Sequence, residues 1–550
     1  MSKRRQAIGL GVVVLASIAV VTGTFSTSTG TAAPPQPPGP IVSQAVKFDK
    51  TPPLRDMKPA PPRGEPGLGA TDRGAVPSDN GHKPDGALQG GPLVNAMPAP
   101  LLTFEGPSNQ DNANAFGFMV APPDPNGDVG LNNYVVMTNI TFAIYSKQGT
   151  RLFGPTPLGT LWQGFLDDCT DPSGDPVVLF DEIANRWILT QFTTRGPEFF
   201  NCVAISTTED PLGSYYRYAF STGLNFPDYP KYGVWPDGLY ITTREFDPND
   251  NESVGVYAVD LHQMLTGTPT PRQVAFHITS PAYLVGDGLL PADLDGKRMP
   301  PAGSPEYLVG SMDDGAFDGA PFDGLNVWQM SVNWAKPAQS TLVLAKQVPI
   351  APFDTIFPCT PPASRNCIDQ PGTQNKIDIL SYRQRPTWRL AYRNFGDHES
   401  LVTDQSVEAR KGIAGVRWWE LRNPANPVLY QEGTYSPDDG VNRWMGSAAM
   451  DKNGDLAVGF SVSNGTTVYP GIRYAGRLAG DPLGQLGQGE AVLKSGSGSQ
   501  TVSARWGDYT ALTVDPADGC TFWYVNEYYQ TSSARGWQTR VGTFRFPACS

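Results

Sequence analysis

A repeated pair of short apolar strands around an acidic turn most limits how this chain can fold. The clearest copies read PVVLFDEIANRWILTQF, MGSAAMDKNGDLAVGFSV and YTALTVDPADGCTFWYV, and weaker copies occur elsewhere between residues 101 and 550. Short apolar runs bounded by turn residues are typical of β-strands. The acidic turn residues of the seven copies are Asp128, Asp181, Asp237, Asp313, Glu408, Asp451 and Asp515.

The repeat predicts an all-β fold, a seven-bladed β-propeller over residues 101–550. With 59 glycines and 53 prolines the chain turns often, which disfavours long helical arrays. A third strand follows most pairs, as in NCVAISTTEDPLG and GIRYAGRLAGDPLG. A lone four-stranded sheet leaves two open edges and a half-buried face, and stacking such sheets in a ring buries those faces. A pair of β-sandwiches or another fold of several sheets is the alternative.

The start of the chain has the layout of a secretory signal peptide over residues 1–33. A basic KRR segment precedes an uncharged apolar run at 8–21, which is shorter than the roughly 20 residues of a membrane span. An uncleaved anchor is the alternative. Residues 34–100 are rich in Pro, Gly and Ala and lack periodicity, which predicts a disordered linker. We expect a secreted, extracellular monomer, released or held at the cell surface, without a membrane span after cleavage.

Six cysteines follow the expected leader. An even number in an exported chain favours disulfides. Proximity along the chain suggests the pairs Cys169–Cys202, Cys359–Cys367 and Cys520–Cys549. Metal binding explains the cysteines less well, because the chain has no C-x-x-C pair and only four histidines.

Ionisable residues recur at one register, ahead of most acidic turns. In a propeller the innermost strands start at one end of a central funnel, so side chains at this register would converge there. The alternative is structural, because strands that start at a water-filled channel carry polar residues in any case. The residues at this register are Asp175, Asp228, Lys231, Glu306, His398, Glu399, Arg443, Arg505 and Asp508.

These residue types suit an acidic sugar as ligand or substrate. Arg443 and Arg505 can each hold a carboxylate or sulfate through two hydrogen bonds, and Lys231 adds a cation. Arg473 would be a third anion contact, although an ion pair between sheets is the preferred explanation for it. Five residues are candidates for proton transfer to or from a sugar or uronate: Asp175, Asp228, His398, Glu399 and Asp508.

No cofactor is expected, with calcium as the one exception to consider. The turns DPNGD at 124–128 and DKNGD at 451–455 resemble the start of a calcium loop but lack the glutamate at its twelfth position. Asp, Asn and Gly also favour tight turns on their own. The formal charge of −12 argues against nucleic acid as a partner, because an acidic surface repels phosphates.

Several longer segments act together as a signature: DPVVLFDEIANRWILTQF, FPDYPKYGVWPDGLYIT, GVRWWELR, RWMGSAAMDKNGDLAVGFSVS, IRYAGRLAGDPLG and RWGDYTALTVDPADGCTFWYVNEYY. Over residues 120–550 they resemble a family of large secreted bacterial β-propeller proteins. The resemblance implies export and a repeated β fold, without an established catalytic residue.

A looser similarity is to sialidase-like propellers, whose blades carry the turn S-x-D-x-G-x-x-W. The segment VDPADGCTFW departs from that spacing. The arginine triad of the sialidases would map onto Arg443, Arg473 and Arg505, and no nucleophile is carried over.

Three functions remain open from the sequence. The first is binding of an extracellular glycan or surface protein through the funnel. The second is a carbohydrate-active enzyme, a glycoside hydrolase or polysaccharide lyase acting on an acidic polysaccharide. The third is a structural adhesion domain on a stalk.

Overall fold

The computed structural model describes residues 37–64, 83–90, 96–166, 168–279, 282–316, 319–359, 361, 364–379 and 385–549. The expected signal peptide, residues 1–33, lies outside these ranges. Strand makes up 46% of the structure and helix 6%, so the all-β prediction is confirmed.

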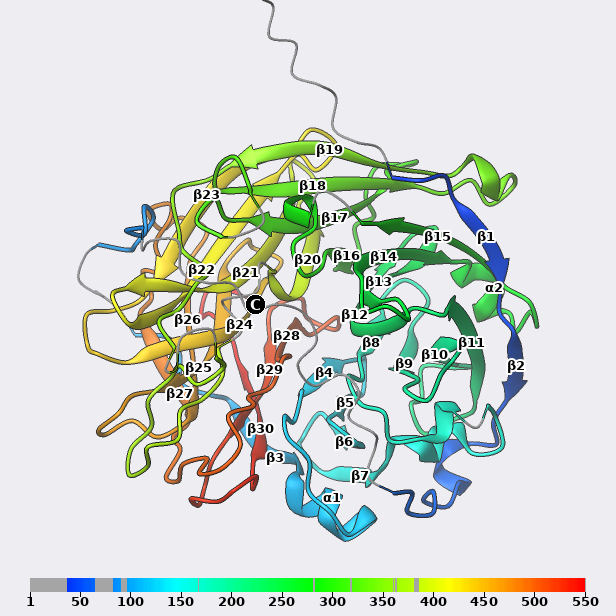
Figure 1. Cartoon of the computed structure of the whole chain (residues 1–550), viewed down its shortest axis with the longest axis horizontal. Coiled ribbons are helices and arrows are strands. Elements are labelled where there is room, and N and C mark those ends of the chain that lie inside the picture. Colours follow the sequence, from blue (N-terminus) through cyan, green and yellow to red (C-terminus); the bar gives the residue numbers. More distant parts are fainter. Residues whose placement is uncertain are drawn as a thin grey trace, which may run out of the picture. The chain divides into compact units, whose positions relative to one another are not determined.

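Hydrogen bonding joins the strands into six sheets, which surround a common centre in Figure 1. Two sheets contain four consecutive strands. The first consists of β4 (Asn126–Val129), β5 (Asn133–Met137), β6 (Thr141–Ser146) and β7 (Arg151–Pro157). The second consists of β24 (Asn442–Met450), β25 (Leu456–Ser463), β26 (Gly471–Arg477) and β27 (Glu490–Lys494).

Three sheets combine a consecutive run with a strand from the N-terminal part of the chain. The first has β8 (Val178–Asp181), β9 (Arg186–Phe192), β10 (Phe199–Ser206), β11 (Tyr215–Gly223) and β2 (Lys47–Lys50). The next has β12 (Phe226–Trp235), β13 (Gly238–Phe246), β14 (Glu252–Val259), β15 (Arg272–Ile278) and β1 (Ile41–Gln44). The last has β28 (Ala511–Val514), β29 (Phe522–Tyr528), β30 (Gln538–Phe544) and β3 (Leu102–Ser108).

The sixth sheet has eight strands and accounts for the difference from the seven separate sheets that the sequence predicts. Its first half is β16 (Leu290–Asp295), β17 (Glu306–Met312), β18 (Gly324–Ser331) and β19 (Thr341–Pro349). Its second half is β20 (Thr387–Asn394), β21 (Glu399–Arg410), β22 (Ile413–Arg422) and β23 (Val428–Tyr435). The halves merge because β16 and β20 pair in parallel, with Ala292 opposite Leu390.

The first strand of each four-strand run contacts the first strand of the next. The order is β4, β8, β12, β16, β20, β24 and β28, and β28 contacts β4 again. These seven strands therefore form a closed ring, with the other strands following outward in order. Side chains on one first strand also bond to the backbone of the next. The amide of Phe180 on β8, for example, donates to Asp128 on β4 at 2.6 Å.

Part of the segment predicted as linker is structured. Strands β1 and β2, both within residues 34–100, add to the outer edges of two sheets. Asp85 forms a 2.8 Å ion pair with the buried Arg417 of β22. These contacts explain the difference from the expected linker, because paired edges and a buried ion pair require order in a Pro-rich sequence.

Helices are few and short. Helix α1 (Asn109–Phe116) begins with a capping box, in which Ser108 and Asp111 bond each other's backbone, and it ends at Gly117 with a positive φ of 83°. Helix α2 (Leu261–Leu265) is capped by Asp260. Single turns of 3₁₀ helix are Leu54–Asp56, Leu158–Trp162, Asp168–Thr170, Ala282–Leu284 and Pro337–Gln339.

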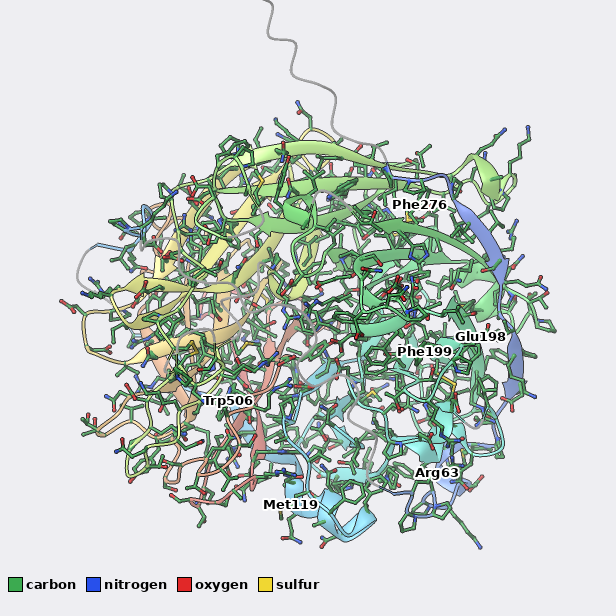
Figure 2. The ribbon with its side chains drawn as sticks, in the orientation of Figure 1. Arg63, Met119, Glu198, Phe199, Phe276 and Trp506 are labelled. Carbon is green, nitrogen blue, oxygen red and sulfur yellow. A yellow bond between two sulfur atoms is a disulfide. The ribbon has the colours of Figure 1, made fainter. Side chains whose placement is uncertain are left out.

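Aromatic side chains fill the space between neighbouring sheets. Trp523 of β29 stacks on Tyr134 of β5, with 4.9 Å between ring centroids. Trp444 and Trp506, of which Figure 2 labels the second, are buried, and their ring centroids lie 5.5 Å apart. Burying a large apolar side chain contributes about 1.5–3 kcal/mol, so these contacts hold the sheets together.

All three predicted disulfides are confirmed: Cys169–Cys202, Cys359–Cys367 and Cys520–Cys549. Such bonds persist in oxidising compartments and therefore fit an extracellular protein. In the described part of the chain, none of the helices is long and apolar enough to span a membrane.

Candidate functional site

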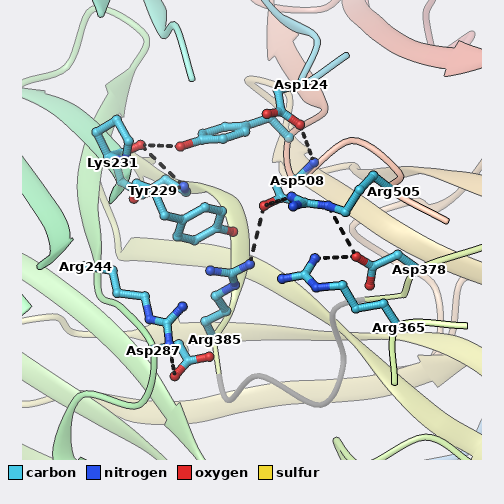
Figure 3. Close-up of polar contacts among 12 residues, drawn as sticks. Asp124, Tyr229, Lys231, Arg244, Asp287, Arg365, Asp378, Arg385, Arg505 and Asp508 are labelled. Atoms are coloured by element: carbon cyan, nitrogen blue, oxygen red, sulfur yellow. Dashed lines mark hydrogen bonds and ion pairs between the residues drawn. The ribbon is translucent and has the colours of Figure 1, made fainter. Parts of the chain in front are cut away.

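Charged residues gather where the first strands of the ring begin. We call this group the strand-start cluster, and Figure 3 shows most of it. Each member lies just before the start of a first strand or within its first residues, or it contacts such a residue. The members are Asp124, Asp175, Asp228, Tyr229, Lys231, Asp287, Arg385, Arg505, Asp508 and Tyr509.

The backbone at these strand starts is unusual. Asp124, Asp175 and Tyr229 have φ of 44°, 44° and 52°, and Met445 at the start of β24 has φ of 49°. A residue other than glycine pays about 1–3 kcal/mol for this left-handed conformation, which collects at functional sites. The register of β12 also shifts between Asp228 and Lys231. Three of these residues lie close enough to one another for their charges to interact, because Asp124 and Asp228 both act on Asp175.

Two carboxyl groups in the cluster resist ionisation. The side chain of Asp124 accepts hydrogen bonds from the Asp508 amide at 2.7 Å and the Asn139 side chain at 2.6 Å. Burial and the nearby Asp508 nevertheless raise the pKa of Asp124 to about 7. Burial and the charges of Asp124 and Asp228 raise the pKa of Asp175 well above its usual range. The cluster therefore holds protons on carboxyl groups near neutral pH.

Lys231 is enclosed by two aromatic rings. Its ammonium nitrogen lies 2.9 Å from the ring centroid of Tyr229 and 3.8 Å from that of Tyr509. It donates to the carbonyl oxygens of Tyr229 and Pro230 at 3.4 and 3.3 Å. Burial, with Arg385 nearby, lowers the pKa of Lys231 well below its usual range. Lys231 is thus an interior group, which differs from the solvent-facing ligand contact that the sequence predicts.

Two arginines reach the cluster from segments before first strands. The guanidinium of Arg385 lies over the Tyr229 ring at 3.5 Å and is 3.7 Å from Asp508. Its Nε and Nη2 atoms are buried and have no hydrogen-bond partner among the described residues. Arg505 lies 3.4 Å from Asp508 and 3.7 Å from Asp378, which also pairs with Arg365. Asp175, Asp228 and Arg505 remain partly exposed, so the cluster is open to solvent on one side.

Five of the sequence-predicted site residues come together here: Asp175, Asp228, Lys231, Arg505 and Asp508. The other predicted residues of the ring lie elsewhere. Glu306 begins β17, a second strand, where it is fully buried. His398 and Glu399 lie at the turn into β21, beyond the far end of β20, where His398 stacks on Phe395 and Glu399 accepts from Tyr392.

Arg443 and Arg473 also lie outside the cluster. Arg443 binds Asp439 at 2.8 Å and Glu490 at 2.7 Å, and Arg473 binds Glu490 at 2.6 Å. Arg473 thus has a structural ion pair, but its partner Glu490 belongs to β27 of the same sheet and not to a neighbouring sheet as expected. Of the arginine triad that the similarity to sialidases implied, Arg505 alone is in the cluster.

The turns that resemble calcium loops use their oxygens internally. Asp128 accepts from the amides of Val129 and Phe180, and Asn126 accepts from the Val178 amide. Asp451 accepts from the amides of Asn453 and Asp455. An Asx turn accounts for the Asp451 contacts, the Asp128 and Asn126 side chains bond the backbone of β8, and calcium binding stays a prediction.

One carboxylate group in the described chain has the geometry to hold a cation. Side-chain oxygens of Asp313, Asp314 and Asp323 lie within 4.8 Å of one another. The Lys83 ammonium pairs with Asp314, and Thr355 donates to Asp313 at 2.8 Å. The charge of this group is thus already partly neutralised within the protein.

No protein-family model and no curated protein match the chain. Solved structures that align with it include an α-L-arabinanase from Penicillium chrysogenum, at 10% identity and a TM-score of 0.34, over 82% of this chain and 100% of that one. The polysaccharide lyase Uly1 aligns at 9% identity and a TM-score of 0.33, over 86% and 98%. A β-1,3-galactosidase of glycoside hydrolase family 43 aligns at 11% identity and a TM-score of 0.28, over 70% and 78%. At these scores the likeness carries no argument about activity.

Sequence reasoning missed Asp287 and Arg385, and it considered Asp124 only as part of a turn. The prediction assumed that each acidic turn follows the first strand of its sheet. Asp313 instead follows the second strand β17, and Glu408 lies in the second strand β21. The site residues predicted from these two turns are therefore at the start of the second strand instead of the first. The segments that could have revealed the first strands are LPADLD and TWRLAYRN. Both alternate buried apolar residues with charged ones and therefore lack the continuous apolar runs of the other first strands.

Proposed function

We propose that this chain is a secreted seven-bladed β-propeller that binds an acidic extracellular polysaccharide at the strand-start cluster. Counting the eight-stranded sheet as two blades gives seven blades, each starting with one strand of the closed ring. The three disulfides support an extracellular location.

The observation that carries this proposal is that the buried guanidinium of Arg385 has unused hydrogen-bond donors. Only 4% of this residue is exposed, and two of its guanidinium nitrogens have no hydrogen-bond partner among the described residues. A buried cation with unused donors is costly unless an anion completes it. A carboxylate accepts two parallel hydrogen bonds from a guanidinium, which makes a uronic acid residue a fitting ligand.

The rest of the cluster suits the neutral part of a sugar. Asp175 and Asp228 are partly exposed beside the arginines, and their oxygens can accept hydrogen bonds from sugar hydroxyls. Arg505 is also partly exposed and can contact a second acidic residue of the polymer.

The test measures binding of polygalacturonate, alginate and hyaluronan to the purified protein, with dextran as the neutral comparison. Arg385→Gln should weaken binding of the preferred polymer by about 10- to 100-fold, as expected for loss of charge-assisted hydrogen bonds. Arg473→Gln is the matched control, because Arg473 lies in another sheet. Equal affinity of the Arg385 variant and wild type would remove Arg385 from the site.

The same geometry supports a second function, hydrolysis of the bound polysaccharide. Asp175 holds a proton that it can donate to the glycosidic oxygen as the bond to the sugar carbon breaks. Asp228 would take a proton from the attacking water, whose oxygen then bonds to that carbon.

Hydrolysis is tested by measuring new reducing ends. Asp175→Asn and Asp228→Asn should each abolish product formation while polymer binding persists. Products with an unsaturated terminal sugar would assign the chain to the lyases instead, and no product from any acidic polymer would leave binding as the function.

A further inference from the structure

A second candidate site lies at the opposite ends of the first strands. A cavity of about 230 Å³ is lined there by Glu182, Gly296, Lys297, Arg393, Lys452 and residues 515–519. We call it the strand-end cavity. Its residues follow β8, β16, β24 and β28 or lie near the end of β20. The cavity is smaller than the roughly 300–1,000 Å³ of pockets for drug-sized ligands.

The strand-end cavity is separate from the strand-start cluster. Arg385 and Arg393 lie before and near the end of the same strand, β20, and eight residues of strand span about 26 Å. Between them, Arg389 binds Asp293 at 3.0 Å and also pairs with Asp295. These buried side chains occupy the interior between the two ends.

Arg393 is the central feature of the cavity. It is 7% exposed, its Nε atom is buried without a hydrogen-bond partner, and it makes no ion pair or hydrogen bond with any described residue. Gly296 leaves room for it, since a Cβ at that position would lie 2.6 Å from the Arg393 Nη1 atom. The strand end is therefore shaped around a guanidinium whose donors remain available.

None of the three acids that line the cavity forms an ion pair with Arg393 in the described chain. Burial and the charges of Asp295 and Asp128 raise the pKa of Glu182 to about 8, so this carboxyl holds a proton at neutral pH. Asp515 is paired with Lys147 at 2.7 Å. Asp518 accepts hydrogen bonds from Thr521 and the Cys520 amide.

Two lysines add positive charge at the rim. Lys297 and Lys452 are both exposed and line the cavity. They can attract an anion from solvent toward the buried guanidinium. The strand-end cavity therefore combines a buried guanidinium with two exposed ammonium groups.

We propose that the strand-end cavity binds a small carboxylate ligand no larger than a monosaccharide acid, with the Arg393 guanidinium holding its carboxylate. A planar carboxylate matches the two parallel donors of a guanidinium. The partly buried Glu182 carboxyl and the cavity backbone can bond the hydroxyl groups of such a ligand. This site is additional to the polysaccharide site and does not depend on it.

The test uses galacturonate as the probe, measured by calorimetry on the full folded protein in the Arg385→Gln background, which removes the strand-start cluster as a competitor. Galactose, citrate and inorganic phosphate are the comparison probes. Galacturonate should bind and galactose should not. Tighter binding of phosphate than of both carboxylates would overturn the assignment of a carboxylate ligand, and no binding of any anion would overturn the site.

Two variants test the residues. Arg393→Gln should weaken galacturonate binding at least tenfold, consistent with loss of charge-assisted hydrogen bonds. Replacing both rim lysines, as Lys297→Gln with Lys452→Gln, changes exposed positions only and should weaken binding several-fold even if the Arg393 variant folds poorly. Lys411→Gln, on a different turn, is the matched control.

The two sites can fail independently. On the otherwise wild-type protein, Arg393→Gln should leave polysaccharide binding unchanged, and Arg385→Gln should leave the strand-end cavity intact. Equal galacturonate affinity of the Arg393 variant and its parent, with the rim variants also unchanged, would contradict the proposal.

Discussion

Buried charged side chains have different partners at the two ends of the ring of first strands. At the strand-start cluster, opposite charges lie within contact distance, as in the Arg385–Asp508 and Arg505–Asp508 pairs. At the strand-end cavity, the guanidinium of Arg393 has no partner in the described chain, and the Glu182 carboxyl beside it holds a proton. Between them, Arg389 is fully paired.

This difference indicates what each end can do. A cluster of both signs with raised and lowered pKa values can orient a polar polymer and move protons. A single unpaired cation in a small cavity cannot do so, but it can select an anion by size and charge. The paired arginine in the middle contributes to the fold alone.

The largest expected effect is a difference in folding stability between variants of Arg389 and Arg393, the two arginines of β20. Arg389→Met leaves Asp293 and Asp295 buried without their partner and should lower the free energy of unfolding by about 3–5 kcal/mol. Arg393→Met removes an unpaired buried charge and should leave stability unchanged or higher. Urea unfolding at pH 7 measures both.

A further variant checks the cause. Adding Asp293→Asn and Asp295→Asn to Arg389→Met should restore part of the lost stability, because no uncompensated charge then remains. If Arg393→Met destabilises as much as Arg389→Met, then Arg393 is structural and the contrast between the two ends disappears.

The same contrast explains which parts of the molecule could be predicted from sequence. Turns such as Asp181, Asp451 and Asp515 directly follow or end first strands, and there the strand–turn–strand pattern located the hairpins correctly. Local hydrogen bonding from an acidic side chain to the turn backbone produces this pattern without tertiary contacts. The disulfides were equally accessible, because cysteines close in sequence bridged neighbouring segments.

The first strands β16 and β20 were missed because tertiary structure overrides their local pattern. Asp293, Asp295 and Arg389 satisfy one another across the parallel pair, so one face of these strands is charged while the other is apolar. This exchange of apolar side chains for an ion network is invisible in a single sequence. Because β20 was not recognised as the first strand, the prediction named His398 and Glu399 at the start of β21 instead of Arg385 before β20.

A smaller effect concerns Asp451, the other acid close to Arg393. Burial and Asp455 raise the pKa of Asp451 to about 7, so the folded state binds a proton that the unfolded state releases above about pH 4. Stability should therefore fall as pH rises from about 4 to 7. Asp451→Asn should remove this loss and stabilise the protein by roughly 2–4 kcal/mol at pH 8.

Asp451→Asn keeps the hydrogen bonds of the turn, because one Asp451 oxygen accepts from both turn amides and the other has no partner in the described structure. Unfolding at pH 4 and pH 8 gives the measurement. Added calcium supplies a second arm: if it stabilises wild type but not the variant, the turn binds calcium and the pKa explanation fails.

The smallest effect is a pH dependence of anion binding at the strand-end cavity. Glu182 faces Asp128 on β4, Asp295 on β16 and Arg393 on β20, and its pKa is raised to about 8. As pH rises through 8 its carboxyl ionises and becomes an internal partner for Arg393, so galacturonate affinity should fall by roughly tenfold. Glu182→Gln keeps an acceptor for the Gly296 amide, which bonds wild-type Glu182 at 3.1 Å. Because Asp451 lies close to Arg393 and its pKa is about 7, both proteins are compared in the Asp451→Asn background, where the Glu182 variant should hold the affinity constant from pH 6 to about 9. Calorimetric titrations across this range compare the two proteins.

Two outcomes would contradict this prediction. An unchanged decline of affinity in the variant would mean that another group controls access to Arg393. A constant affinity in the protein with Glu182 would mean that Glu182 is already ionised and that Arg393 has a partner.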